Sequence, residues 1–336
     1  MNRPTIRDIA REAGVSTTAV SFALNNRPGI SEATRTRILE TANRIGWAPN
    51  LRAQSLSLAK ADAIGLFIAR QAESFSSERF FFNFIAGLEQ TLSEHGYDLV
   101  FHTGVDTDRE IATYRLWRAQ GRVDGVVLVD PQEGDPRIAV LRELEMPVVV
   151  VGSEAPGLPS VVGDEKAMID QLAAHLVERG ARRIGYVSLV PSLLHVRGRI
   201  DALEEFAREH GIEQVTVSCK DATEAAGGEA IGALLERESL PDAVIFDNEM
   251  LALGGMSALR AAGKTVGQDV LIASCEDSPL CRLVTPTITV ASREPAGLGA
   301  TAGKLLIDVI AGEPARVVAD APAEIIVRES TKGRIP

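Results

Sequence analysis

Cysteines and aromatic residues are scarce in this 336-residue sequence, and it contains no long apolar run. The three cysteines, Cys219, Cys275 and Cys281, form no Cys-x-x-Cys pair and leave one over, a pattern that suits a reduced cytoplasm. No stretch approaches the roughly 18–20 apolar residues of a membrane span, and the first eight residues lack the apolar segment of a secretion signal. We therefore expect a cytoplasmic protein with no membrane partner.

Motifs that carry enzyme chemistry are also missing. The sequence has no Gly-x-Gly-x-x-Gly after a strand and no Gly-x-x-x-x-Gly-Lys-Ser/Thr loop, which disfavours dinucleotide and triphosphate enzymes. Its five histidines are scattered, and none has the spacing of a metal ligand. We expect a protein that is not an enzyme and needs no cofactor or metal, although sequence alone leaves open a carboxylate pair at catalytic separation.

Charge is distributed unevenly along the chain. Residues 1–60 hold nine Lys or Arg against four Asp or Glu, whereas the remainder holds 26 against 42. The length predicts two or three domains, and 45% hydrophobic with 24% charged residues is typical of globular chains. Phosphate neutralisation needs local positive charge, so residues 1–60 are a candidate nucleic-acid-binding segment, although a chance cluster of solvated arginines gives the same count.

This basic segment has the spacing of a helix-turn-helix. Thr5 and Asp8 form a capping box at the start of a helix that Gly14 ends. Ser16 caps a second helix over residues 17–25. In a helix-turn-helix the second helix enters the major groove, so the exposed face of this helix is the candidate reader of DNA sequence.

A third helix follows a cap at Ser31, and we expect Ile38 and Leu39 to face the core of the segment. Three arginines should point outward, where they can hold phosphates and fix the register on DNA without reading its sequence. They are Arg35, Arg37 and Arg44.

Several motifs of this segment occur together at fixed spacing. They are Thr-Ile-Arg-Asp-Ile-Ala from residue 5, Ala-Gly-Val-Ser from residue 13, and Ser-Glu-x-Thr-Arg from residue 31. This run resembles the head of the lactose-repressor (LacI/GalR) family of bacterial transcriptional regulators. The resemblance implies that Thr17, Thr18 and Phe22 face base edges. Other implied contacts with DNA are Thr5, Ser16, Ser21, Asn25 and Ser31. Many relatives carry arginine where Phe22 stands, and phenylalanine can pack on a thymine methyl but cannot bond guanine.

Residues 49–60 form either a plain linker or a hinge helix. The seven amphipathic residues from 51 to 57 are marginally stable as an isolated helix. The resemblance implies a hinge helix that orders on DNA and pairs with its dimer mate in the minor groove, through Asn50, Ala53 and Gln54. Leu56 stands at the family's intercalating leucine, which opens a base step and bends the duplex. Gln54 replaces an arginine of many relatives.

From residue 61 apolar strands alternate with helices. We expect strands at 63–68, 97–101, 125–129, 146–151, 183–188, 215–218, 243–246 and 270–274. Strands that are apolar on both faces indicate parallel sheets flanked by helices. We therefore predict an all-α helix-turn-helix head and an α/β, two-lobed body like a periplasmic binding protein. The expected divisions are a head at 1–48, a hinge at 49–60 and a body at 61–332, with an N-lobe of about 61–160 and 291–320 and a C-lobe of about 161–290 and 321–332.

Polar residues that follow the strands are candidates for binding a small effector, because ligands bind beyond the carboxyl ends of parallel strands. Asp130, Asn248 and Glu276 follow three of the expected strands. Their carboxylates and amide suit the hydroxyls of a sugar. Each of them could equally serve as a cap for the next helix.

The family resemblance extends this candidate site. By spacing, His195 occupies the slot of the family's effector arginine, while Arg197 could reach the cleft from a neighbouring turn. Glu249 and Glu276 stand where the family pattern has aspartate, which could suit a charged or larger ligand as readily as a neutral sugar. The segment from residue 78 to 89 adds two further candidates, Arg79 and Phe80.

We expect a homodimeric repressor that binds a near-palindromic operator and changes affinity when a sugar or sugar derivative occupies the cleft. Two heads at a spacing set by DNA geometry require a dimer. One alternative is a sugar-uptake receptor of the same shape, which should carry a secretion signal and no head. The other is a carbohydrate-active enzyme.

Overall fold

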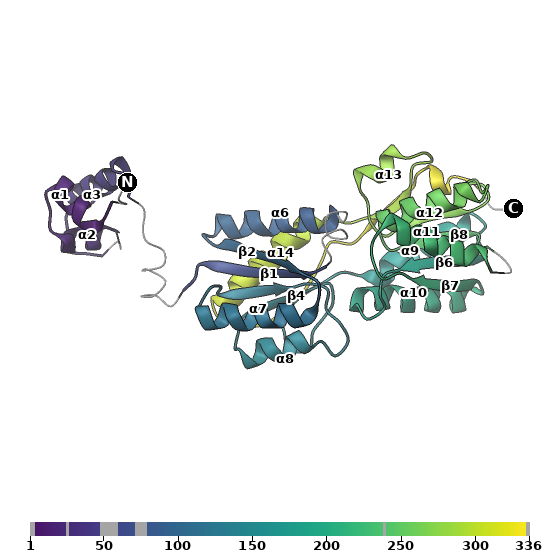
Figure 1. Ribbon diagram of the computed structural model, residues 1–336, viewed down its shortest axis with the longest axis horizontal. Helices are drawn as coiled ribbons and strands as arrows, with labels where there is room; N and C mark the ends of the chain where they lie inside the picture. Colours follow the sequence, from purple (N-terminus) through teal and green to yellow (C-terminus); the bar gives the residue numbers. More distant parts are fainter. Residues whose placement is uncertain (1–3, 25–26, 48–59, 71–78, 238–239, 334–336) are drawn as a thin grey trace. The chain divides into compact units, whose positions relative to one another are not determined.

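The computed structural model describes residues 4–24, 27–47, 60–70, 79–237 and 240–333 (Figure 1). The chain divides into two units, Met1–Lys60 and Ala61–Pro336. Among the helices of the described ranges, none is both long and apolar enough to cross a membrane.

The described part of the first unit contains three helices. The capping box is present as predicted, because Asp8 N donates to Thr5 Oγ1 at 3.4 Å and Thr5 N donates to Asp8 Oδ2 at 2.9 Å. Gly14 then adopts a left-handed φ of 65° at the helix end, a conformation that costs glycine little. The helices are α1 (Ile6–Ala13), α2 (Thr17–Leu24) and α3 (Glu32–Arg44).

One residue from each helix lies at the centre of this unit. Ile9, Val20 and Ile38 are fully buried against one another's helices. The expectation that Leu39 also faces inward is wrong, since its side chain is 41% exposed. Successive helical residues point about 100° apart, so Ile38 and Leu39 cannot both face a core this small.

The first lobe of the second unit contains a parallel six-stranded sheet with the order β11-β5-β4-β3-β1-β2. The short strand β5 and the edge strand β11 were not among the expected strands. The strands are β1 (Ala63–Ala69), β2 (Asp98–Gly104), β3 (Gly125–Leu128), β4 (Val148–Val151), β5 (Ser160–Val162) and β11 (Val317–Ala319).

Helices cover both faces of this sheet, so β1 is buried along nearly its whole length. On one face lie α6 (Arg79–Glu94) and α14 (Pro295–Ile310), and on the other lie α7 (Thr107–Gln120) and α8 (Pro136–Glu143) (Figure 1). The helices α6 and α14 approach closely at Gly87, where a Cβ atom would lie 1.9 Å from the Ala296 carbonyl oxygen.

The second lobe repeats the plan with the order β12-β10-β9-β8-β6-β7, in which β12 runs antiparallel to β10. In this lobe α9 packs against α10, and α11 packs against α12. The strands are β6 (Arg183–Ser188), β7 (Glu213–Ser218), β8 (Ala243–Phe246), β9 (Leu271–Ser274), β10 (Thr289–Ser292) and β12 (Glu324–Ile326). The helices are α9 (Glu165–Glu178), α10 (Leu194–His210), α11 (Glu224–Leu235), α12 (Glu249–Ala261), α13 (Pro279–Leu283) and the 3₁₀ helix η1 (Glu329–Thr331).

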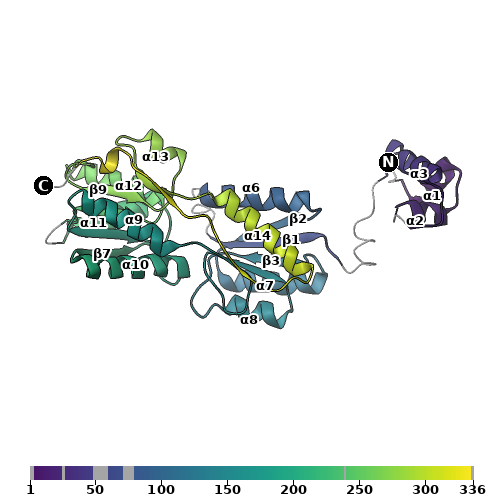
Figure 2. The same cartoon turned by 180° about the vertical axis from the view of Figure 1, so that it is seen from behind.

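Within the described residues the chain passes between the lobes three times, after β5, after β10 and after β11. Figure 2 shows the last passage in yellow. The lobes also touch where two loops meet, because Leu194 N donates to Pro131 O at 2.9 Å and Gln132 forms an isolated antiparallel bridge with Leu193. The segments that follow the parallel strands of both lobes therefore face one space.

Candidate functional site

The exposed start of α2 presents the residues expected to meet DNA. Thr17 and Thr18 are exposed, whereas Ser21 and Phe22 are half-buried. Ser16 accepts a hydrogen bond from Ala19 N at 3.1 Å through its hydroxyl, which makes it the cap of this helix as predicted. Two hydroxyl groups at the N-terminal end of a recognition helix are well placed to reach base edges or phosphates.

The Phe22 ring also has a structural role. It lies over Gly29, where a Cβ atom would be only 3.0 Å from Cε2 of the ring. Gly29 has a φ of 118°, a conformation open mainly to glycine, and this keeps the loop after α2 close to the ring. Phe22 is therefore held in one place while part of it remains accessible.

Arg35 does not point outward as expected. Its Nη1 donates to the carbonyl oxygens of Phe22 and Ala23 at 3.3 and 3.2 Å, and its Nη2 donates to the Arg27 carbonyl at 2.8 Å. The last carbonyls of a helix have no partner within the helix, and the guanidinium satisfies those of α2. Arg37 and Arg44 remain exposed as expected, and Arg44 also pairs with Glu12 at 3.5 Å.

The structure describes only some of the other residues that were expected to contact DNA. Ser31 caps α3, with its hydroxyl accepting from Thr34 N at 3.3 Å, and Thr5 caps α1. Both side chains therefore cap the first turn of a helix. Five residues of the expected interface, including all of its hinge contacts, lie outside the described residues. They are Asn25, Asn50, Ala53, Gln54 and Leu56.

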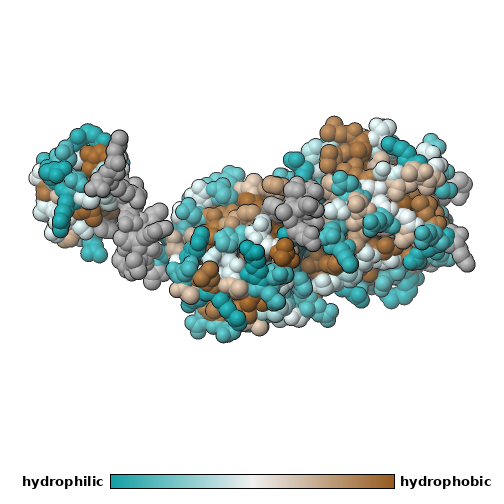
Figure 3. Space-filling view, in the orientation of Figure 1, coloured by the Kyte–Doolittle hydropathy of each residue, from teal (hydrophilic) through white to brown (hydrophobic). Residues whose placement is uncertain are grey.

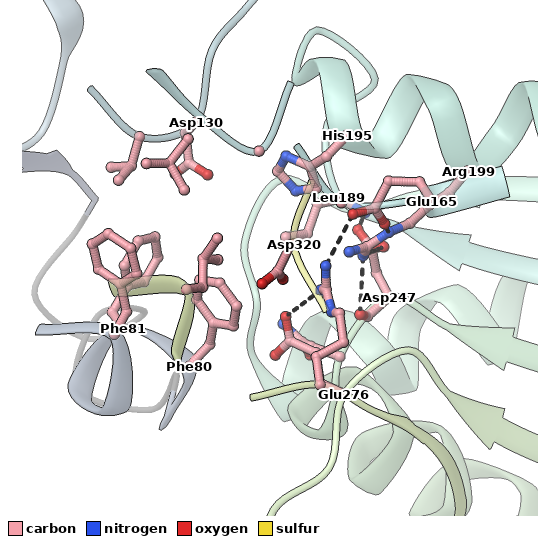
Figure 4. A pocket seen from close by; sticks show the side chains of 18 of the residues that line it. Phe80, Phe81, Asp130, Glu165, Leu189, His195, Arg199, Asp247, Glu276 and Asp320 are labelled. Atoms are coloured by element: carbon pink, nitrogen blue, oxygen red, sulfur yellow. Dashed lines mark hydrogen bonds and ion pairs between the residues drawn. The ribbon is translucent and has the colours of Figure 1, made fainter. Parts of the chain in front are cut away.

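A pocket lies between the two lobes of the second unit (Figure 4). We call it the interlobe pocket. Of the seven expected effector residues, Arg79 and Arg197 are not among its lining residues, and both are exposed. Five do line it. They are Phe80, Asp130, His195, Asn248 and Glu276.

The arginine that reaches the interlobe pocket is Arg199 and not Arg197. Arg197 is 56% exposed and pairs with Asp201 at 3.0 Å on the outer face of α10. Two positions along a helix rotate a side chain by about 200°, so only one of these arginines can face the pocket. His195 lies one helical turn before Arg199 and shares its face.

Arg199 is buried between two carboxylates. Its Nε donates to Glu165 Oε2 at 2.5 Å, and its Nη1 donates to Asp247 Oδ1 at 2.5 Å. Asp247 also accepts from the Tyr186 hydroxyl at 2.6 Å and from Leu189 N at 2.9 Å. The charge of Arg199 is therefore neutralised within the protein.

Two further arginines of the interlobe pocket are paired in the same way. Arg293 Nη1 donates to Glu165 Oε1 at 2.9 Å, and its Nη2 lies 3.7 Å from Glu276. Its guanidinium stands 5.7 Å from the centre of the Phe80 ring. Arg70 pairs with Asp130 at 2.8 Å. In Figure 4, Glu165, Arg199 and Asp247 lie across the pocket from the Phe80 and Phe81 rings of α6, and Asp130 lies on the same side as the rings.

The electrostatics of the interlobe pocket follow from burial and these pairs. Burial alone would raise the pKa of Glu165, but Arg199 and Arg293 outweigh it and lower the pKa to about 2. Burial and then Arg199 lower the pKa of His195, so its ring is neutral at pH 7. Burial raises the pKa of Asp320, which lines the pocket from the third passage between the lobes.

Six charged residues that line the interlobe pocket were not among the expected site residues. Asp247 directly follows a predicted strand, so the strand-end rule that identified Asn248 as a candidate also identifies Asp247. Asn248 itself caps α12, because its side chain accepts from Leu251 N at 3.0 Å. Glu165, Arg293 and Asp320 gave no such signal, since they lie at the passages between the lobes. The six are Arg70, Glu165, Arg199, Asp247, Arg293 and Asp320. Among the described residues, no group of His, Cys, Asp and Glu could hold a metal ion.

Comparison with known proteins gives matches to both units. The family model for "Bacterial regulatory proteins, lacI family" matches residues 5–50, and that for "Periplasmic binding protein-like domain" matches residues 173–331. The HTH-type transcriptional regulator AglR of Rhizobium meliloti (strain 1021) is 32% identical over 343 residues, which cover 97% of this chain and 94% of that protein.

Solved structures of regulators are similar as well. A LacI family transcriptional regulator from Bifidobacterium animalis subsp. lactis is 30% identical with a TM-score of 0.75, covering 82% of this chain and 99% of that one. The complex of the transcriptional regulator CelR with cellobiose is 26% identical with a TM-score of 0.75, covering 98% of this chain and all of that one.

Proposed function

This chain belongs to the lacI family of bacterial regulatory proteins and is a DNA-binding transcriptional regulator, not an enzyme, and from this premise we propose that an uncharged sugar in the interlobe pocket controls its affinity for operator DNA. In this proposal residues 1–48 read the operator, residues 49–60 form the hinge, and residues 61–332 bind the effector and the second copy of the chain. The protein acts in the cytoplasm, as a repressor.

The pairing of the charged groups in the interlobe pocket is the observation that favours an uncharged effector. The described residues that line it include five carboxylates and three arginines, and each of the arginines already has a carboxylate partner. An anionic effector such as a sugar phosphate or a sugar acid would meet an excess of negative charge. A neutral sugar can accept from the arginines and donate to the carboxylates without disturbing either.

The aromatic side of the interlobe pocket supports the same choice. Phe80 and Phe84 stack with their ring centres 6.4 Å apart and line the pocket opposite the ion pairs. The hydrophobic C–H face of a sugar can pack on such a wall while its hydroxyls meet the charged side. The cellobiose complex of CelR is consistent with an uncharged sugar in a protein of this fold.

On the DNA side we propose that Thr17, Thr18 and Phe22 contact bases, with Arg37 and Arg44 at phosphates. Two copies of the head must bind together to read a near-palindromic operator. Figure 3 shows an apolar patch over α13, where Leu280 and Leu283 are 38% and 78% exposed, and a second copy could cover it.

Two measurements test this function. In a thermal-shift screen of the full chain, neutral mono- and disaccharides should raise the melting temperature, whereas their phosphorylated and carboxylated counterparts should not. Stabilisation by the anionic sugars alone would contradict the proposal. Operator affinity should fall steeply as the salt concentration increases from low to moderate, and a flat response would argue against phosphate-dependent DNA binding.

A further inference from the structure

The loop that follows α2 lies beside the proposed DNA-reading face of the head. Residues 27–31 form the described part of this loop, which ends where α3 begins. Its backbone returns onto the end of α2, because Arg27 N donates to the Phe22 carbonyl oxygen at 2.9 Å. Gly29 then lies against the Phe22 ring, so close that a Cβ atom there would be 3.0 Å from Cε2. The loop and the half-buried Phe22 ring therefore form one surface.

Arg35 holds the same loop from the side of α3. Its Nη2 donates to the Arg27 carbonyl oxygen at 2.8 Å, while its Nη1 donates to the last carbonyls of α2. Both backbone polar groups of Arg27 therefore have partners within the head. The Arg27 side chain projects from a position that is fixed relative to Phe22.

The arginines of the head differ in whether a carboxylate offsets their charge. Arg11, Arg35 and Arg44 each lie within 3.5 Å of a carboxylate oxygen. Arg27 is exposed, and its guanidinium has no hydrogen bond or ion pair with any other described residue. Arg7 and Arg37 are also exposed and without a carboxylate partner among these residues, but they belong to α1 and α3 and not to the loop. The full charge of Arg27 is therefore available beside Phe22.

We propose that Arg27 binds a backbone phosphate of the operator next to the base pairs that Phe22 meets. This inference rests on the proposed contact of α2 with bases. The Phe22 ring is uncharged and cannot neutralise a phosphate, whereas a guanidinium can hold two phosphate oxygens through parallel hydrogen bonds. Such a contact fixes register without reading sequence. Because a backbone hydrogen bond joins Arg27 to Phe22, the phosphate contact positions the ring on the DNA.

The test is operator binding by the full chain, measured by fluorescence anisotropy over a range of salt concentrations with a duplex selected from a random pool. Arg27→Ala should raise Kd at least about tenfold, because each of the two heads loses a charge-assisted hydrogen bond. The slope of log Kd against log salt concentration should decrease by about 0.9 for each head, or roughly 2 in total. Arg27→Lys keeps the charge, so it should retain most of the slope and recover part of the affinity.

Methylphosphonate duplexes locate the contact. Each duplex carries an uncharged methylphosphonate in place of one phosphate of each half-site. We expect one position at which this change weakens binding of the wild type and does not weaken binding of Arg27→Ala further. Arg11→Ala removes an equal charge from the last turn of α1 and is the matched control, which should keep the wild-type profile of sensitive positions.

Three results would overturn the phosphate contact. One is an unchanged affinity and salt slope in Arg27→Ala, and another is the absence of a position that only Arg27 makes sensitive. The third is a changed preference at one base pair with an unchanged slope, which would identify Arg27 as a reader of bases. Thr18→Val tests the proposed base contacts separately, since Thr18 is exposed and lies outside the loop. An unchanged base preference in that variant would refute the contact proposed for Thr18, whatever Arg27 does.

Discussion

The Arg293 guanidinium donates to the Glu165 carboxylate at 2.9 Å, and this pair joins two of the segments by which the chain passes between its lobes. Glu165 begins α9 just after the first passage, and Arg293 lies in the second. Both residues also line the interlobe pocket. A ligand that contacts either one therefore contacts the chain where it joins the two lobes.

Arg293→Met should weaken sugar binding at least tenfold, with a smaller loss of stability than Arg199→Met causes. The variant removes a donor from the pocket wall beside Phe80, while Glu165 retains its bond to Arg199. Titration calorimetry with a sugar that stabilises the wild type measures the effect. Arg282→Met, which removes an exposed arginine paired with Asp277, is the matched control and should bind normally. Unchanged affinity in Arg293→Met would show that this arginine is not part of the binding surface.

Arg199→Met should destabilise the second unit by about 3–5 kcal/mol, because it leaves Glu165 and Asp247 facing each other without their shared cation. Urea unfolding at pH 7 measures the loss. Arg197→Met changes an exposed residue of the same helix and should cost less than about 0.5 kcal/mol.

A triple variant tests the cause of that loss. Combining Arg199→Met with Glu165→Gln and Asp247→Asn removes the buried negative charges and should restore part of the stability. No recovery in the triple variant would mean that lost packing, and not uncompensated charge, explains the effect of the single substitution.

Acid should weaken the fold through Glu165. Its folded pKa of about 2 lies below its ordinary value of 4.5, so its contribution is complete above pH 4.5 and decreases as the pH falls towards 2. Between pH 6 and pH 3 the wild type should lose about 2 kcal/mol that Glu165→Gln does not lose. Unfolding by urea across this pH range measures both proteins. Parallel curves would show that Glu165 is not held ionised by its two arginines.

Arg35→Ala should loosen the end of α2 and weaken operator binding, because the carbonyls of Phe22, Ala23 and Arg27 each lose the hydrogen bond from this guanidinium. Amide hydrogen exchange in the full chain should show faster exchange in α2. Arg37→Ala, an exposed neighbour, should instead leave exchange unchanged and reduce the salt dependence of DNA binding. Equal exchange in the two variants would contradict the capping role of Arg35.

Local patterns predicted the framework well. The caps at Thr5, Ser16 and Ser31 and the glycine at 14 depend only on neighbouring residues, and each is present. The eight expected strands were long or strongly apolar and are also present. Four strands were not expected. The strands β5, β11 and β12 have three residues each and β10 has four, which is too few for a pattern, and their pairing is set by tertiary contacts.

The interlobe pocket was predictable only in part. Asp130, Asn248 and Glu276 line it because strand ends converge in a parallel sheet. Glu165, Arg293 and Asp320 reach it from the passages between the lobes, which no periodicity marks. Spacing alone placed His195 in the arginine slot and offered Arg197 as a neighbour, whereas the arginine that the helix turns inward is Arg199.

The most direct test of the account is the operator affinity of the full chain with and without a bound sugar. The operator is a duplex selected by the protein from a random pool, and fluorescence anisotropy gives Kd in each state. The account predicts that a saturating neutral sugar changes Kd at least tenfold, and that operator DNA changes the affinity for the sugar by the same factor. A sugar that binds tightly and leaves the operator Kd unchanged would contradict it.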